Sequence, residues 1–293
     1  MRIVFIGSVE FSAEMLKELI LMQANLVGVC TLAKSNINAD HFDLMKIASP
    51  VGIPLKYTND INNVEVIKWI ESLSPDVIFC FGWSKLIKKD LLMVPRIGVV
   101  GFHPTALPAN RGRHPLIWAL ALGLTESAST FFFMDEGADS GDVLSQMPFH
   151  ILSDDDAASL YVKVVATAKK QMREFVPLLA SGNYSRKRQI LSHGNVWRKR
   201  GKEDGRIDWR MAAETIHNLV RSLAKPYVGA HFDFGKLEVK VWRTRIVGSL
   251  PQNLEPGKVL DVSSEGALIK TGIGAIRLME IDPKIQLTEG QYL

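Results

Sequence analysis

The chain has very little cysteine and no long hydrophobic segment. Only two cysteines occur in 293 residues, Cys30 and Cys80, and both lie in apolar stretches of strand length, where a thiol usually packs as a small core side chain. We therefore expect neither a disulfide nor a metal site. No apolar run of about 18 residues is present that could cross a membrane, and the first apolar stretch is too short for a secretory signal peptide. These absences predict a cytoplasmic protein with no membrane partner.

The net positive charge is modest, and it is unevenly distributed. The formal net charge is only +4, and two basic clusters lie close together, at residues 186–188 and 198–202. Such a region is either a solvated linker or a surface that contacts phosphate or RNA. The low net charge argues against a broad nucleic-acid surface, but the sequence leaves both interpretations open.

The first part of the chain alternates apolar segments of strand length with segments of helical period, which predicts a parallel sheet with crossover helices. Strands are expected at residues 2–7, 25–32, 54–58, 76–82, 98–104, 128–134 and 143–151. Helices are expected directly after the first strand, at 63–73, and at 154–179 with Ser153 as the N-cap.

After residue 180 the pattern changes. Residues 183–205 are polar, basic and rich in turn formers, and we expect them to link two domains. A short helix at 212–223 precedes short strands at 237–242, 258–262, 267–271 and 275–281, which are typical of a small barrel or an open sheet. The expected fold is α/β: a Rossmann-like, mostly parallel sheet with flanking helices in residues 1–182, and a small β-rich, barrel-like domain in 206–293.

One histidine and one aspartate stand where chemistry is expected. His103 comes at the end of a predicted strand, and ligands of open α/β sheets bind beyond the carboxyl ends of the strands. Asp139 follows another strand in a glycine-punctuated loop, and near His103 it can orient the imidazole and accept a proton from an attacking amine. Each alone is an ordinary strand-end or turn residue, but together they favour acyl transfer.

The segment after His103 is expected to be rigid. Pro104 and Pro108 restrict it, and Arg111-Gly112 precedes a helix with Pro115 in its first turn. This arrangement presents side chains and a helix N-terminus to an anionic or carbonyl-containing ligand.

Four strings together resemble the folate-dependent formyltransferases. They are HPTALPANRG from His103, GADSGD from Gly137, IVFIGSVEFS from Ile3 and FGWSKLI from Phe81. Residues 205–209 and 225–227 are similar to the entry to the small C-terminal domain of the family, so the resemblance covers nearly the whole chain. Within that family the chain resembles methionyl-tRNA formyltransferase and the nucleotide-sugar N-formyltransferases.

The resemblance implies transfer of a formyl group from 10-formyltetrahydrofolate to a primary amine, with an Asn, a His and an Asp around the formyl carbon. His103 and Asp139 match the last two. It also implies that the folate co-substrate lies against one loop, with Ala138 and Asp139 across from it. The residues of that loop are Phe81, Gly82, Trp83, Leu86 and Ile87.

The chain departs from the family pattern at Gly101, where an asparagine is expected two positions before His103. Asn110 or a backbone N–H can replace the missing donor, or turnover is slower by about 10²-fold or more. A third alternative is that the chain binds folate without turnover, and a fourth is that it hydrolyses the formyl-folate.

For the acceptor, the resemblance favours an amino sugar carried on a nucleotide, in lipopolysaccharide or surface-glycan biosynthesis. Arg111, Gly112 and Arg113 are the expected acceptor-binding residues, with Arg113 on the nucleotide phosphates. The alternative acceptor is initiator tRNA, contacted by the basic residues 186–202. A homodimer is expected by analogy alone, and neither the sugar nor the nucleotide is specified.

Overall fold

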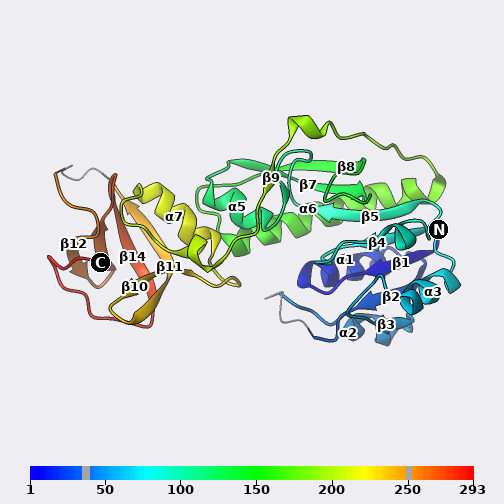
Figure 1. Cartoon of the computed structure of the whole chain (residues 1–293), viewed down its shortest axis with the longest axis horizontal. Coiled ribbons are helices and arrows are strands. Elements are labelled where there is room, and N and C mark those ends of the chain that lie inside the picture. The colour runs from blue at the N-terminus through cyan, green and yellow to red at the C-terminus, as the bar shows by residue number, and fades with distance from the viewer. Residues whose placement is uncertain (35–39, 249–252) are drawn as a thin grey trace. The chain divides into compact units, whose positions relative to one another are not determined.

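The computed structural model describes residues 1–34, 40–248 and 253–293. It divides into two compact units (Figure 1). Unit 1 comprises Met1–Pro115, Ser127–Phe149 and Val162–Trp197, and unit 2 comprises Leu116–Glu126, His150–Tyr161 and Arg198–Leu293. Most of the 183–205 stretch therefore packs within unit 1, and only its last residues belong to unit 2. The boundaries proposed from the sequence stay a prediction.

Unit 1 is built on a seven-stranded sheet of order β3-β2-β1-β4-β5-β7-β8. Its strands are β1 Ile3–Ile6, β2 Leu26–Thr31, β3 Leu55–Tyr57, β4 Val77–Cys80, β5 Gly98–His103, β7 Glu126–Phe133 and β8 Val143–His150. The ladders from β3 to β5 are parallel, and β5 and β7 are antiparallel. This confirms the mostly parallel sheet.

Short and long helices lie between these strands or follow the last of them. The helices are α1 Glu10–Leu21, α2 Met45–Ala48, α3 Val64–Ser72, α4 Lys89–Leu92, α5 Pro115–Ala121 and α6 Ala157–Ser181, with 3-10 turns η1 Ser49–Val51, η2 Leu191–His193 and η3 Lys202–Gly205. Two very short strands, β6 Arg111–Gly112 and β9 Val196–Trp197, pair in parallel. The helix expected at 63–73 is confirmed, and Asn63 caps it by accepting a hydrogen bond from Glu65 N.

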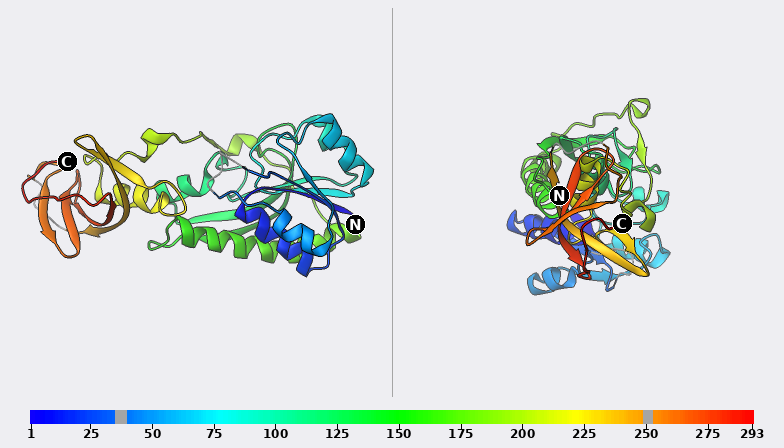
Figure 2. Two further views of the ribbon diagram at one scale, coloured as in Figure 1. Left: turned by 90° about the horizontal axis from the view of Figure 1, so that it is seen from below. Right: turned by 90° about the vertical axis from the view of Figure 1, so that its left-hand side faces the viewer.

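The two faces of the unit 1 sheet are covered by different helices (Figure 2). On one face Phe175 of α6 packs against Phe79 and Phe131, with ring centroids 6.2 and 4.8 Å apart. On the other face α3 packs its apolar residues into a cluster that contains Cys30 and Cys80. Both thiols are free and buried, and burial raises the pKa of Cys30 to about 12. The prediction that both act as core residues is confirmed.

Helix α6 begins later than the sequence suggested, and Ser153 is not its cap. Asp156 Oδ1 accepts from Ser159 N at 2.9 Å, and Ser159 Oγ accepts from Asp156 N at 3.0 Å. This reciprocal pair closes the first turn at Ala157. Asp155 Oδ2 instead accepts from Leu152 N, which shapes the preceding turn. The acidic residues thus form the turn and the cap, because their short side chains bond nearby backbone amides.

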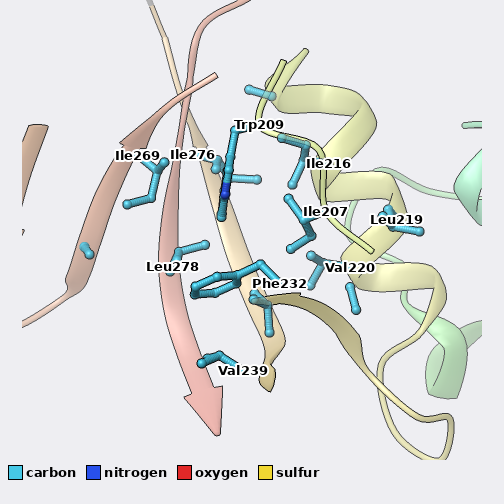
Figure 3. Packing of buried hydrophobic residues seen from close by; sticks show 14 of the residues in the cluster. Ile207, Trp209, Ile216, Leu219, Val220, Phe232, Val239, Ile269, Ile276 and Leu278 are labelled. Carbon is cyan, nitrogen blue, oxygen red and sulfur yellow. The ribbon is translucent and has the colours of Figure 1, made fainter. Parts of the chain in front are cut away.

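Unit 2 carries a five-stranded antiparallel sheet of order β10-β11-β14-β13-β12. Its elements are α7 Ala213–Ser222, β10 Ala230–Phe234, β11 Leu237–Val247, β12 Val259–Ser263, β13 Gly266–Lys270 and β14 Ala275–Asp282. Ile216 and Val220 of α7 point toward Trp209, Phe232 and the sheet (Figure 3). In the part of the chain that the structure describes, the ladders form the open-sheet alternative, since none closes β10 onto β12.

Strand β10 was missed by the sequence analysis. It forms a hairpin with β11, in which Phe234 pairs with Leu237 and Gly235 adopts a positive φ of 62°. A two-residue Gly-Lys turn between alternating apolar residues is a hairpin signal, so the sequence contained the information.

Candidate active site

His103 is the last residue of β5, at the carboxyl edge of the parallel strands. Its backbone pairs with Thr130 of β7, and its side chain is almost fully buried. The position agrees with the predicted strand end. The β5–β7 ladder holds the backbone of His103, and its imidazole borders the edge at which ligands of such sheets bind.

Both ring nitrogens of His103 face named partners. Nε2 lies 2.9 Å from the carbonyl oxygen of Asn110, and because a carbonyl only accepts, Nε2 carries the proton. Nδ1 lies 3.6 Å from Asp139 Oδ2. That oxygen also accepts a hydrogen bond from Gly112 N at 3.0 Å. The structure therefore brings His103, Asp139, Asn110 and Gly112 together, from two loops.

The space between His103 Nδ1 and Asp139 Oδ2 can hold one proton. With its proton on Nε2, the neutral imidazole presents a lone pair at Nδ1 toward the carboxylate of Asp139. Two acceptors that face each other at 3.6 Å can share an incoming proton, and catalytic hydrogen bonds are often long before substrate binds. The pair is thus arranged to take up a proton from a reacting group at the sheet edge.

Gly101 lies on the same face of β5 as His103, since residues two apart in a strand point the same way. A Cβ atom at Gly101 would lie 2.9 Å from Met134 Cγ and 3.0 Å from Phe132 Cζ. Any larger side chain there requires Met134 to move. The position that the family fills with an amide is therefore bordered here by a thioether and an aromatic ring.

Asn110 has left-handed backbone geometry, with φ of 62°. Its carbonyl oxygen accepts from His103, and its N–H donates to Asn195 Oδ1 at 2.7 Å. Because both backbone groups of Asn110 are hydrogen-bonded, the backbone from which its side chain extends is fixed beside His103. The nearby loop is pinned as expected: Thr105 Oγ1 donates to Ala109 O, and Gln146 Nε2 donates to Leu107 O.

The predicted folate loop is divided between core and surface. Phe81 is fully buried among aromatic rings, and both its N–H and its carbonyl are engaged, with Ile6 O and Ser12 Oγ. Ile87 is also buried in the core. Leu86 is 62% exposed, so it alone of the two aliphatic residues is free to pack on a ring. The side chains of Phe81 and Ile87 stabilise the loop from beneath.

Trp83 is the residue of this loop with an unmet hydrogen-bonding need. Its indole Nε1 is buried, and it has no partner among the residues that the structure describes. A buried donor without a partner is costly, so Trp83 Nε1 is available to donate to a ligand or to an ordered water. Ala138, expected across from the loop, is exposed.

Ser8 and Ser12, which were not predicted as site residues, form hydrogen bonds that fix the predicted folate loop of residues 81–87. Ser12 Oγ donates to Phe81 O at 2.6 Å and accepts from Ser8 N, while Ser8 Oγ donates to Gly82 O at 3.3 Å. Gly82 has a positive φ of 68°, and a Cβ there would lie 2.2 Å from Val9 Cγ2. Only glycine fits this close approach, because the turn after β1 occupies the space.

The predicted acceptor-binding residues lie on the same loop as Asn110. Gly112 has φ of 105°, and a Cβ there would lie 2.3 Å from Trp197 O. Arg113 is exposed, and its Nη1 donates to Ser84 O at 3.3 Å, which brings it to the folate loop. Arg111 has a buried Nε without a partner among the described residues.

In unit 2, most of the basic cluster at 198–202 is already paired. Arg198 forms a two-point ion pair with Asp204, and Lys202 pairs with Glu238 at 2.5 Å. Arg198 and Arg200 stack on Trp118, with guanidinium carbons 5.3 and 4.5 Å from the ring centroid. The two ion pairs reduce the charge available to a polyanion.

Two surface cavities lie away from His103. One of about 440 Å³ is lined by residues of α2, η1 and β3, and one of about 580 Å³ by residues around Arg96 and Tyr184. Neither of these two cavities is lined by His103 or Asp139. The Asp139 side chain is 21% exposed. Within residues 1–34, 40–248 and 253–293, no helix is long and apolar enough to cross a membrane, and no three His, Cys, Asp or Glu residues gather as a metal site.

Two family models match this chain. The formyl transferase model matches residues 1–176, and the model of the formyl transferase C-terminal domain matches residues 199–289. The chain therefore belongs to the formyl transferase family.

Solved structures share the fold. WlaRD, a sugar 3N-formyl transferase crystallised in the presence of dTDP and 5-N-formyl-THF, has a TM-score of 0.70 at 17% identity and covers 97% of this chain and 99% of its own. The N-formyltransferase from Helicobacter canadensis, in complex with folinic acid and dTDP-3-aminofucose, has a TM-score of 0.71 at 16% identity, over 94% of this chain and 98% of that chain.

HypX from Aquifex aeolicus, with a TM-score of 0.68 at 21% identity, covers 96% of this chain but only 44% of its own. This chain thus spans less than half the length of HypX. Methionyl-tRNA formyltransferase from Clostridium thermocellum is also similar, with a TM-score of 0.61 at 19% identity over 84% of this chain and 94% of its own. At sequence identities of 16–21%, the similarity to these structures shows the fold alone.

Proposed function

We propose that this chain transfers a formyl group from 10-formyltetrahydrofolate to the primary amine of a nucleotide-linked amino sugar. Membership in the formyl transferase family supports the reaction type. The observation that carries the proposal is the His103–Asp139 pair, whose Nδ1 and Oδ2 atoms are 3.6 Å apart at the carboxyl edge of the sheet. We place the reaction in surface-glycan synthesis; the cytoplasmic location and a homodimer stay predictions.

In the proposed mechanism Asp139 and His103 manage the proton. The folate co-substrate supplies the formyl carbonyl. As the amine nitrogen bonds to the formyl carbon, the carbonyl oxygen takes the electron pair, and Asp139 with His103 accepts a proton from the new ammonium. When the bond from the formyl carbon to the folate nitrogen breaks, the pair returns that proton to the departing nitrogen. The products are the formamide and tetrahydrofolate.

Asn110 is the proposed donor to the oxygen that gains negative charge. Gly101 offers no side chain, whereas the backbone of Asn110 is fixed against His103. A fixed amide aimed at a developing oxyanion accelerates acyl transfer, because the donor is already oriented when the charge appears.

The loop of Phe81 to Ile87 fits a reduced pterin. Trp83 Nε1 is a buried hydrogen-bond donor without a partner among the described residues, and we assign it to a pterin acceptor atom. The exposed side chain of Leu86 offers an apolar surface for the ring. Phe81 and Ile87 are assigned to supporting this loop rather than to touching the ring. Solved relatives of the same fold carry folates, which supports the assignment.

We assign the formyl acceptor, a nucleotide-linked amine, from the position of Arg113. Its guanidinium reaches the folate loop at Ser84, and guanidinium groups suit phosphate oxygens. One solved relative was crystallised in the presence of dTDP and another in complex with dTDP-3-aminofucose, which favours a nucleotide-linked amine.

A single assay tests the function and its alternatives. The protein is mixed with 10-formyltetrahydrofolate alone, with dTDP-linked amino sugars, or with charged initiator tRNA, and tetrahydrofolate release is followed. We expect release only with an amino-sugar nucleotide. Release without any acceptor would mean hydrolysis, and binding without release in every arm would mean a folate-binding module.

Release only with tRNA would identify a methionyl-tRNA formyltransferase instead. The observation that favours this second candidate is the basic stretch in unit 2, with Arg198 and Arg200 stacked on Trp118. The ion pairs of Arg198 and Lys202 count against it.

Replacing Arg113 by Ala is expected to raise KM for the acceptor about tenfold or more, since a charge-assisted hydrogen bond to phosphate is worth about 1.5–3 kcal/mol. KM for the folate should change little. Steady-state kinetics with each substrate varied in turn measures the effect. Arg96→Ala is the matched control, because it removes the same charge from a surface pair with Asp76. An unchanged acceptor KM in Arg113→Ala would remove this residue from the acceptor site.

A further inference from the structure

The residues expected to form a plain linker instead contact both catalytic loops. We name residues 187–197 the strap. It pairs Lys187 with Val143 and ends in β9, which lies beside β6 of the His103 loop. All of these residues belong to unit 1.

At one end of the strap, Gln189 holds the turn of Asp139. The Gln189 side chain is almost fully buried, and its Nε2 donates to Asp139 O at 3.0 Å and to Gly141 O at 2.6 Å. Asp139 has a positive φ of 56°, which costs free energy in a residue with a Cβ atom. Something must hold such a backbone in place, and one amide group that bonds two carbonyls of this turn does so.

At the other end, Asn195 holds the turn of Asn110. Asn195 Oδ1 accepts from Asn110 N at 2.7 Å, and its carbonyl accepts from Arg111 N at 3.1 Å. A Cβ at Gly194 would lie 2.0 Å from Pro108 O, so the two segments touch backbone to backbone. Asn110 is also left-handed, and it is the residue whose carbonyl meets His103 Nε2.

Each end of the strap thus bonds a residue that faces one ring nitrogen of His103: Asp139 at Nδ1 and Asn110 at Nε2. Gln189 bonds the backbone carbonyl of Asp139, whose carboxylate faces Nδ1. Asn195 bonds the backbone N–H of Asn110, whose carbonyl oxygen faces Nε2. We propose that Gln189 and Asn195 are positioning residues that hold Asp139 and Asn110 against His103 in the geometry needed for formyl transfer. This inference rests on the proposed function, and it adds residues that touch no substrate.

The kinetic test uses Gln189→Met and Asn195→Ala, which remove the hydrogen bonds at similar or smaller volume. We expect kcat to fall about tenfold or more in each, because a displacement of about 1 Å at a reacting centre costs up to about 10²-fold. KM for folate and acceptor should stay within about twofold. Asn195→Asp keeps the Oδ1 acceptor for Asn110 N, so it should retain most of the activity.

Gln171→Met is the matched control. Gln171 is also a buried glutamine of unit 1, and its Nε2 donates to Ser129 O at 3.1 Å and to Ser145 Oγ at 2.9 Å, outside both catalytic loops. It should lower the melting temperature as Gln189→Met does and leave kcat unchanged. An equal loss of kcat in Gln171→Met, or no loss in Gln189→Met and Asn195→Ala, would overturn the proposal.

A second readout needs no turnover. The ¹⁵N chemical shifts of the His103 ring report which nitrogen carries the proton, and we expect Nε2–H in the unaltered chain and in Asn195→Asp. In Asn195→Ala and Gln189→Met the shifts should move toward a tautomer mixture, while Gln171→Met leaves them in place. If no acceptor supports formyl transfer, the proposed function fails, and these shifts alone then decide: unchanged values in both strap variants would overturn the positioning role.

Discussion

Asp139→Asn is expected to lower kcat/KM for formyl transfer by about 10²- to 10⁴-fold, the range that a general base supplies. The substitution keeps the shape of the side chain and an oxygen for Gly112 N, but its amide cannot take a proton. The oxygen that lies 3.6 Å from His103 Nδ1 is then still present, but it is an amide oxygen that cannot share an incoming proton with the imidazole. Folate binding, measured by equilibrium titration, should stay within a few fold.

The control for this variant is Asp135→Asn. Asp135 lies in the same loop and accepts hydrogen bonds from Gly137 N and Ser140 Oγ, so it loses the same charge without touching His103. Activity in Asp139→Asn above about one tenth of the unaltered rate, well short of the loss expected of a general base, would remove the carboxylate from the chemical step. A loss of the same size in Asp135→Asn would point to loop folding instead.

Asn110→Gly is expected to lower kcat by about 10²- to 10³-fold, the effect of removing one oxyanion donor. Glycine keeps the backbone at φ of 62° without strain, so the carbonyl that meets His103 Nε2 stays in place. The variant therefore removes the amide side chain and little else. Single-turnover kinetics, which isolates the chemical step, measures the effect.

Restoring the family asparagine gives the complementary result. In the Asn110→Gly background, Gly101→Asn with Met134→Ala should recover activity, because the new amide lies on the same face as His103. Met134→Ala is included because Met134 Cγ lies 2.9 Å from the position of the new Cβ. Met134→Ala alone is the control. Full activity in Asn110→Gly would show that the Asn110 amide is not the oxyanion donor. A gain in rate from Gly101→Asn with Met134→Ala in the otherwise unaltered chain would show that the missing donor limits turnover.

Local patterns in the sequence predicted much of unit 1. The parallel strands and the helix expected at 63–73 follow from the spacing of apolar residues. His103 ends one strand and Asp139 follows another, and the structure places their side chains 3.6 Å apart. Because β5 and β7 are antiparallel, their carboxyl ends lie at opposite edges of the sheet. Strand order alone therefore does not give this pairing, since the loop after β7 has to bring Asp139 back to His103.

Other features could not be read locally. Phe81 and Ile87 belong to an apolar run after a strand, and only packing shows that they lie under the loop while Leu86 faces out. Gln189 and Asn195 stand in a polar, turn-rich stretch that resembles any linker. Their partners are 50 and 85 positions away, at Asp139 and Asn110, and nothing in the residues nearby points to them.

The order of residues alone was enough to define the fold class of this chain, its resemblance to a family and the two residues at the centre of the expected chemistry. Those properties depend on periodicity and on short strings, which are encoded by neighbours. The folded chain decided which polar atoms are left without a partner, where Met134 borders Gly101, and how the strap holds two left-handed residues against one imidazole. Such contacts join distant segments, and their energies depend on distances of a few tenths of an ångström, which exist only once the chain is packed.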